Sequence, residues 1–122
     1  MSQLKKFQEI LAQYRRHGWG LARVLARPET AASMRGTVEG GGGDGTEGSG
    51  VSFEGAPVAE SEVDAMWFSR PSAEGREAWE LRLVGDTPYA LFELFEPDEA
   101  EEDREDVRRE MEARLREYAG GS

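Results

Sequence analysis

The residues of this sequence that could do chemistry are one histidine and many carboxylates. His17 is the single histidine, and it precedes Gly18 at the end of a helical pattern. A general base needs a nucleophile and an orienting carboxylate, but the sequence has no GxSxG motif and no second histidine. Because a cation suits the last carbonyl groups of a helix, we interpret His17 as a helix-end residue. With 25 acidic residues among 122, no single carboxylate pair indicates glycosidase-type catalysis.

The sequence also contains no motif for binding a metal ion or a phosphate group. The acids of residues 98–106 fall on a helical pattern, from which side chains radiate, and they lack the glycine-kinked loop of an EF-hand. The stretch 36–50 is more than half glycine, but it is acidic and contains no lysine, which a P-loop requires. The chain has no cysteine, which excludes disulfides, thiolate ligands and a cysteine nucleophile. We expect no catalytic, metal-binding or cofactor-binding residues, and we interpret residues 36–50 as a flexible loop.

The two ends of the chain predict long amphipathic helices. Near the N-terminus, apolar residues recur at helical spacing, and Gly18 stands where a glycine ends a helix. Residues 96–118 form the second helical pattern, with acids in its first turn and arginines in its later half, as the helix dipole favours. A shorter helix is predicted from Pro28 to Met34. The apolar stripes of the two long helices are Leu4, Phe7, Ile10, Leu11 and Tyr14, and Val107, Met111, Leu115 and Tyr118.

The middle of the chain predicts a sheet. Residues 65–70, 76–84 and 89–95 alternate in the manner of strands and are joined by short turn-rich links, so we expect three consecutive antiparallel strands. Shorter strands are predicted at 19–26 and 51–53, and residues 56–64 are read as a loop or one helical turn. The sequence thus predicts one α+β domain over residues 1–122. We expect an antiparallel sheet of four to five strands with both long helices packed on one face.

The sheet pattern is apolar on more than one face. We place Trp79, Leu81 and Leu83 on the helix-covered face, together with the side chains of Met66, Phe68, Phe92 and Leu94. Four large side chains then point the other way, where a sheet open to water should be polar. These residues are Trp67, Tyr89, Leu91 and Phe95. Either they form a partner-binding surface, or residues 51–58 or the short helix fold back to cover them, and the sequence favours neither reading.

Composition narrows the classes of partner. The net charge of −10 repels phosphate backbones, so we expect no nucleic-acid binding. The basic N-terminal helix is the one place where an anion could dock, although neutralising the acidic remainder is the simpler role for it. No apolar stretch approaches the roughly 20 residues of a membrane span, so we expect no membrane partner and a cytoplasmic protein.

The sequence therefore favours a non-catalytic interaction protein, self-associating as a homodimer through Trp67, Tyr89, Leu91 and Phe95. One alternative is an acidic chaperone or adaptor for a basic or unfolded client. In composition alone, the chain is similar to small acidic chaperones of bacterial secretion systems. Another alternative is a small-ligand-binding protein or enzyme with a pocket between sheet and helices.

The glycine-rich loop yields a first testable prediction. Deleting Gly40–Gly48 should leave the fold intact, because the entropy of loop closure changes slowly with loop length. The measurement is thermal unfolding of the full chain and of the deletion variant. A large loss of melting temperature would contradict the interpretation of residues 36–50 as a loop.

Overall fold

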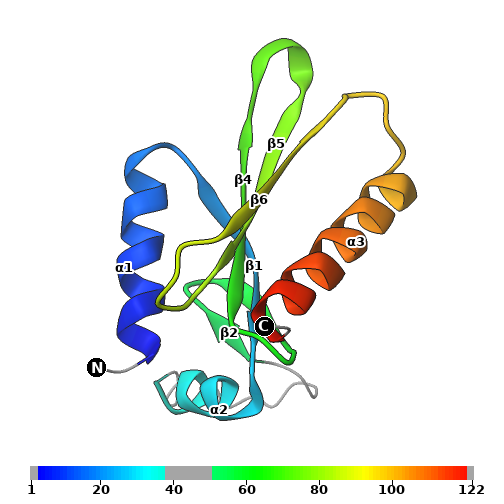
Figure 1. Ribbon diagram of the computed structural model, residues 1–122. Helices are drawn as coiled ribbons and strands as arrows, with labels where there is room; N and C mark the ends of the chain where they lie inside the picture. Colours follow the sequence, from blue (N-terminus) through cyan, green and yellow to red (C-terminus); the bar gives the residue numbers. More distant parts are fainter. Residues whose placement is uncertain (1–2, 38–50, 121–122) are drawn as a thin grey trace.

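A computed structural model describes residues 3–37 and 51–120 of the chain. Six strands form one mixed sheet in the order β2-β3-β1-β4-β5-β6 (Figure 1). Most of the predicted glycine-rich loop, residues 38–50, lies outside the described residues. The elements are α1 (Gln3–Arg16), β1 (Gly20–Ala26), α2 (Pro28–Thr37), β2 (Ser52–Phe53), β3 (Ala56–Glu60), β4 (Ala65–Pro71), η1 (Ala73–Gly75), β5 (Glu77–Leu83), β6 (Ala90–Phe95) and α3 (Glu101–Gly120).

The end of α1 follows the sequence signal. Gly18 has a positive φ of 87°, and the Trp19 N–H donates to the Tyr14 carbonyl at 3.0 Å. A left-handed residue followed by this backward hydrogen bond is the usual glycine-terminated helix end. The turn directs the chain straight into β1, so the position of α1 over the sheet is fixed by its last residues.

The sheet is not wholly antiparallel, which corrects the sequence prediction. β3 pairs parallel to β1, with Val24 opposite Val58, and α2 lies in the crossover between the two strands. β3 was read as a loop or a helical turn because Pro57 and the acids around it obscure any alternation. Parallel strands are joined by a long crossover and not by a tight turn, so no short sequence motif predicts their pairing. The sheet therefore gains a strand and a parallel pair that local patterns do not predict.

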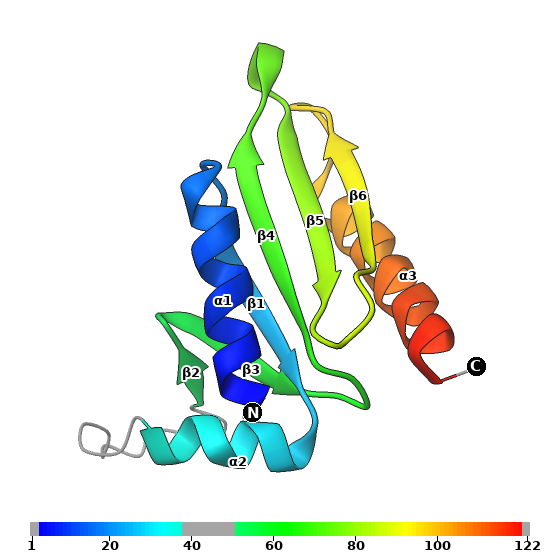
Figure 2. The ribbon, with the colours of Figure 1, turned by 60° about the vertical axis from the view of Figure 1, so that its left-hand side comes forward.

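The two long helices cover opposite faces of the sheet, so the prediction that they share one face is wrong. Phe7, Ile10 and Leu11 of α1 pack in one core with the strand residues of one face. Met111 and Leu115 of α3 pack in a second core with those of the other. Figures 1 and 2 show the sheet lying between α1 and α3. Each face of the sheet therefore carries its own apolar core.

The register between strands explains why the prediction assigned residues from both faces of the sheet to one face. Trp67 lies opposite Leu81, and Leu81 lies opposite Leu91, so these three side chains share the face covered by α3. Phe68 lies opposite Glu80 on the other face. Alternation within each strand was predicted correctly. The pattern of one strand does not determine which residues of the neighbouring strand lie on the same face, because that depends on the register between the two.

The packing of α3 against the sheet gives a testable prediction. Leu115 is fully buried in the second core, so Leu115→Ala should lower the free energy of unfolding by about 2–5 kcal/mol. Urea unfolding monitored by circular dichroism measures the change. Arg109→Ala on the exposed side of the same helix is the matched control and should change stability by no more than about 0.5 kcal/mol. Equal, small effects of both substitutions would contradict the packing of α3 on this face.

Candidate interaction surface

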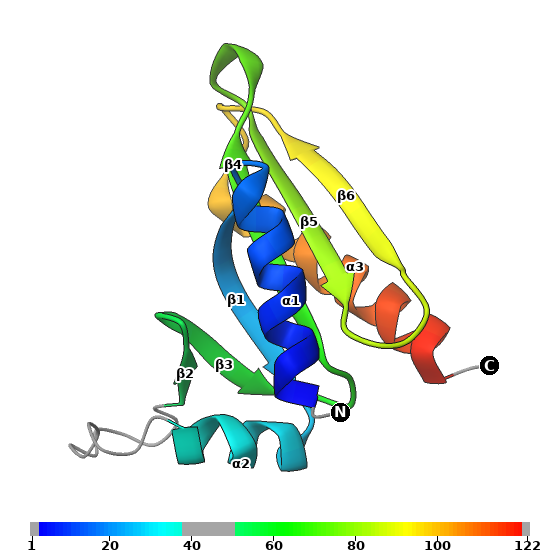
Figure 3. The same cartoon turned by 90° about the vertical axis from the view of Figure 1, so that its left-hand side faces the viewer.

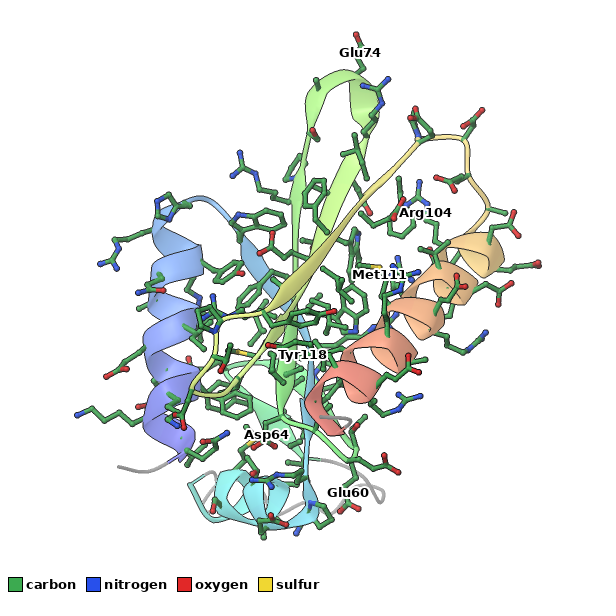
Figure 4. The ribbon with its side chains drawn as sticks, in the orientation of Figure 1. Glu60, Asp64, Glu74, Arg104, Met111 and Tyr118 are labelled. Atoms are coloured by element: carbon green, nitrogen blue, oxygen red, sulfur yellow. The ribbon has the colours of Figure 1, made fainter. Side chains whose placement is uncertain are left out.

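The four residues predicted to bind a partner lie under α3. Trp67 and Phe95 have no exposed surface, and Leu91 and Tyr89 are partly buried in the same core. The ring of Tyr89 stacks on Tyr118 of α3, with centroids 3.7 Å apart. Figure 4 shows Met111 and Tyr118 extending from α3 toward the strands. The apolar face is covered within the chain, by the C-terminal helix rather than by residues 51–58 or α2.

A buried guanidinium holds α3 against this face. Arg108 is only 2% exposed, and its guanidinium carbon lies 4.0 Å from the ring centroid of Trp79. Its Nη1 donates to Glu101 at 2.8 Å and to Glu105 at 2.7 Å. Stacking on an aromatic face while pairing with carboxylates suits the planar, weakly hydrated arginine head. Arg108 thus links the start of α3 to the centre of the sheet.

Glu105 connects the same helix to β1. Its two carboxylate oxygens accept hydrogen bonds from Arg23 at 3.1 and 2.9 Å, a two-point contact that fixes both side chains. The bond from Arg23, aided by Arg108, lowers the pKa of Glu105 from its usual 4.5 to about 2, although burial opposes the shift. Trp67 adds a second link, since its ring N–H donates to Glu112 at 2.8 Å. The face that looked available for a partner is therefore held to α3 by polar as well as apolar contacts.

Apolar side chains are exposed instead on the face of α1, along β6. Phe92 is 56% exposed and Leu94 is 36% exposed. Figure 3 shows α1 in front of β1 and β4, with no helix in front of β5 and β6 on that side. Phe92 and Leu94 were predicted to lie on a covered face, but α1 does not extend over β6 and leaves them exposed. We define the β6 edge surface as Ala90, Phe92 and Leu94 together with the neighbouring ring of Trp19.

A row of aromatic rings links the core of this face to the β6 edge surface. Tyr14 stacks on Phe68 at 4.0 Å, Trp19 meets Tyr14 edge-on at 6.0 Å, and Phe92 meets Trp19 edge-on at 6.5 Å. Burial raises the pKa of Tyr14 to about 12, and the hydrogen bond that its hydroxyl donates to Glu80 adds to the rise. Phe92 is therefore the exposed end of a rigid apolar row.

The backbone of β6 has a free edge. The Leu83 N–H donates to the Tyr89 carbonyl at 2.9 Å, and in an antiparallel ladder bonded pairs alternate with non-bonded ones. With Leu81 opposite Leu91, the polar groups of residues 91, 93 and 95 point to β5. Those of Ala90, Phe92 and Leu94 point away from the sheet. No strand in the described ranges 3–37 and 51–120 pairs with this edge.

The two edges of the sheet differ in how they are protected. The opposite edge is β2, which has two residues, and such short strands offer little template for another chain. β6 has six residues and no proline, and its one charged residue, Glu93, lies on the α3 side. Natural sheets usually blunt an edge of this length with charges, proline, a bulge or a covering loop. The β6 edge has none of these among its outward residues.

A cleft of about 330 Å³ lies at the other end of the molecule, between the start of α1 and the end of α3. Asp64 accepts hydrogen bonds there from the Arg27 N–H at 2.8 Å, from Thr30 at 3.0 Å and from Gln3 at 2.9 Å (Figure 4). Lys6, at the rim, pairs with Asp86 at 2.8 Å. These groups join α1, α2 and the start of β4, so most of the charge in the cleft is engaged within the chain.

Comparison with protein families, with curated proteins and with solved structures finds no match to this chain. Within residues 3–37 and 51–120, no group of three or more histidine, cysteine, aspartate or glutamate side chains is arranged to hold a metal ion. In the same part of the chain, no helix is both long enough and apolar enough to cross a membrane.

Glu105 yields a prediction on pH dependence. Its carboxylate has a lower pKa in the folded chain than in the unfolded chain, so its stabilisation is complete above about pH 4.5 and is lost as the pH falls toward about 2. Glu105→Gln should remove a contribution on the order of 2 kcal/mol at pH 6 and flatten the fall in stability between pH 4.5 and 2. Urea unfolding at a series of pH values measures both effects.

Asp106→Asn is the matched control for this experiment. Asp106 is the next residue on α3, and it pairs with Arg109 where both side chains are largely exposed. Its variant should follow the acid profile of the unmodified chain, because an exposed ion pair contributes little. If Glu105→Gln also follows that profile, the Arg23–Glu105 contact does not stabilise the fold.

Proposed function

We propose that this chain is a non-catalytic interaction protein that binds an extended polypeptide strand along the free edge of β6. The observation that carries the proposal is the coincidence of unpaired backbone groups and exposed apolar side chains on the same residues. Ala90, Phe92 and Leu94 combine both features. Strand addition uses the backbone for affinity and the alternate side chains for specificity.

Acidic residues around β6 influence which strands would bind. Asp98 and Glu99 follow the strand, whereas Asp86 before it and Glu96 after it are paired with Lys6 and Arg76. A negative rim attracts a strand with basic flanks and raises its rate of encounter at low salt. A basic client thus supports the second candidate function, that of an acidic chaperone or adaptor. Such binding should weaken as salt is added, because exposed charges are screened.

The geometry of the edge yields a prediction that needs no partner. Leu94→Pro removes an outward N–H, so β6 should keep its pairing with β5 and the chain should lose little stability. Glu93→Pro removes an N–H that points to β5, and it should lower the free energy of unfolding by about 1–3 kcal/mol through the lost ladder hydrogen bond. Thermal and urea unfolding compare the two adjacent positions. Equal losses would contradict the outward direction of the Leu94 N–H.

Binding of a strand is tested by amide exchange at β6. The probe is a ten-residue synthetic peptide of alternating valine and threonine with two lysines at each end. On addition of peptide, the amides of Ala90, Phe92 and Leu94 should become protected, whereas those of residues 91, 93 and 95 are protected already. Leu94→Pro should weaken the binding at least fivefold, a loss of about 1 kcal/mol for one backbone hydrogen bond. The protein is kept at a concentration at which it is monomeric, and absence of protection there at millimolar peptide would overturn the proposed function.

A further inference from the structure

We infer that the strand added at β6 belongs to a second copy of this chain, so that two β6 strands pair antiparallel across a two-fold axis at Phe92. The inference rests on the proposed function, because it names the partner for the same edge. A two-fold dimer brings the same surface of both copies together, so the surface has to be complementary to itself. The β6 edge meets this condition in its backbone, its side chains and the charges of the adjacent helix.

The outward residues select one register. Residues that lie opposite each other in an antiparallel pair point to the same face of the joined sheet, and side chains alternate between faces along a strand. In a two-fold pair of identical strands, one residue of β6 therefore lies opposite its own symmetry mate, and the axis passes between these two residues. An axis at Glu93 sets that carboxylate directly against Glu93 of the second copy, and like charges directly opposite destabilise a sheet. An axis at Phe92 pairs the two Phe92 rings, sets Ala90 opposite Leu94, and moves Glu93 opposite Leu91. In this register all three outward residues of each copy meet outward residues of the other.

The side chains in this register suit a dry contact. Phe92 is 56% exposed in the single copy and is braced from behind by the edge of Trp19 at 6.5 Å. Directly opposed residues in such a pair have Cβ atoms about 5 Å apart, which is within reach of two aromatic rings. The pair would bury the most exposed large apolar side chain of the described residues together with its symmetry mate.

The helix α3 runs alongside β6 in the opposite direction. Tyr118, near the end of α3, stacks on Tyr89, just before β6, and Arg104, near its start, lies 5.6 Å from the ring of Phe95. The middle of α3, around Met111, is therefore level with Phe92. An axis at Phe92 places the middles of the two α3 helices beside each other, with the helices antiparallel on the same face of the joined sheet.

Two exposed charges on α3 fit this arrangement. Glu105 and Glu112 face Arg23 and Trp67 on the inner strands. Helical spacing places Glu110 and Arg114 on the opposite side of the helix, toward β6. Both lie close to the middle of α3, so the two-fold axis brings Glu110 near Arg114 of the second copy, and the reverse. In the described ranges of the chain, neither Glu110 nor Arg114 has an ion-pair partner.

Sedimentation velocity over a range of protein concentrations tests the assembly. The unmodified chain should reach a dimer, although its net charge of −10 opposes association and should make the dimer reversible. Phe92→Glu should raise the dissociation constant at least tenfold without changing the circular dichroism spectrum. Ala113→Glu makes the same charge change at an exposed position of α3 away from the strands, and it should stay as dimeric as the unmodified chain after allowance for the added charge.

Single cysteines test the register, since the natural chain has none. Residues opposed in an antiparallel pair have Cα atoms about 5 Å apart, which a disulfide can bridge. Phe92→Cys should therefore form a covalent dimer on mild oxidation, seen on a non-reducing gel. Ala90→Cys and Leu94→Cys should each form little alone, but the variant carrying both should crosslink. Ala113→Cys gives the background from random collision.

A charge exchange tests the contact between the helices. Glu110→Arg and Arg114→Glu should each raise the dissociation constant of the dimer about fivefold, and the variant carrying both should return to near the natural value. Because Glu110 and Arg114 are also four residues apart on one helix, an equimolar mixture of the two single variants is the control. The mixture should dimerise more tightly than either single variant alone, which a contact within one helix would not produce. Loss in the single variants without recovery in the double variant would overturn the antiparallel placement of the helices.

The outcomes separate the inference from the proposed function. A chain that stays monomeric at millimolar concentration, but whose β6 amides are protected by the lysine-flanked peptide, overturns the second copy and keeps strand binding. A dimer that is unaffected by Phe92→Glu and gives no Phe92→Cys crosslink above background also overturns the inference, because its interface lies elsewhere. A monomer whose β6 amides are not protected by the peptide overturns both.

Discussion

The burial of the Arg108 guanidinium between α3 and the sheet is the contact on which the arrangement of both sheet faces depends. A buried cation is stable only when paired, and removing a partner from such a group usually costs several kcal/mol. Glu101 and Glu105 pair with it, and the ring of Trp79 lies against its plane. This geometry specifies one position for α3, whereas apolar packing alone would tolerate several. The helix is thereby committed to the face that would otherwise expose Trp67 and Phe95.

The placement of α3 determines what the opposite face must do. In the part of the chain that the structure describes, α1 and α2 are the helices that cover that face, and their contacts concentrate on β1, β4 and the short strands. The half of the face formed by β5 and β6 therefore carries polar residues such as Glu80 and Arg82, with Phe92 and Leu94 beside them. Phe92 and Leu94 are exposed because no described helix covers β5 and β6 on this face. The same residues carry the unpaired backbone groups of β6.

Local patterns predicted most elements of the fold, but they did not predict how the elements combine. The glycine end of α1 and the alternation of β5 are short-range signals, and both are confirmed by the structure. The faces were mixed because register is a property of two strands, and β6 is apolar on both sides. β3 was missed because its pairing partner, β1, lies more than thirty residues away. The one sequence signal that could have predicted the exposure of Phe92 is the polar side of β5, because Glu80 on that side lies opposite Phe92.

The apolar character of both sheet faces was predicted, but the residues that stay exposed were not. An excess of apolar residues in 65–95 correctly indicated that the sheet has more apolar surface than one helix layer covers. The sequence assigned that excess to Trp67, Tyr89, Leu91 and Phe95, which α3 covers, because the destination of the C-terminal helix was not determined by its own stripe. The apolar stripe of an amphipathic helix predicts that one side of the helix is buried, but it does not predict which face of the sheet covers that side.

The central position of β1 has a consequence for how this chain reaches its native state. β1 lies between β3 and β4, so both of its neighbours are made after it, and Gly20 ends up opposite Ser69. On the ribosome, the first third of the chain therefore emerges with a strand that has nothing to pair with. The hairpins of β4, β5 and β6 form through short links, whereas seating β1 requires closure of two long loops. Assembly should thus proceed from the later strands backward, with the N-terminal segment inserted last.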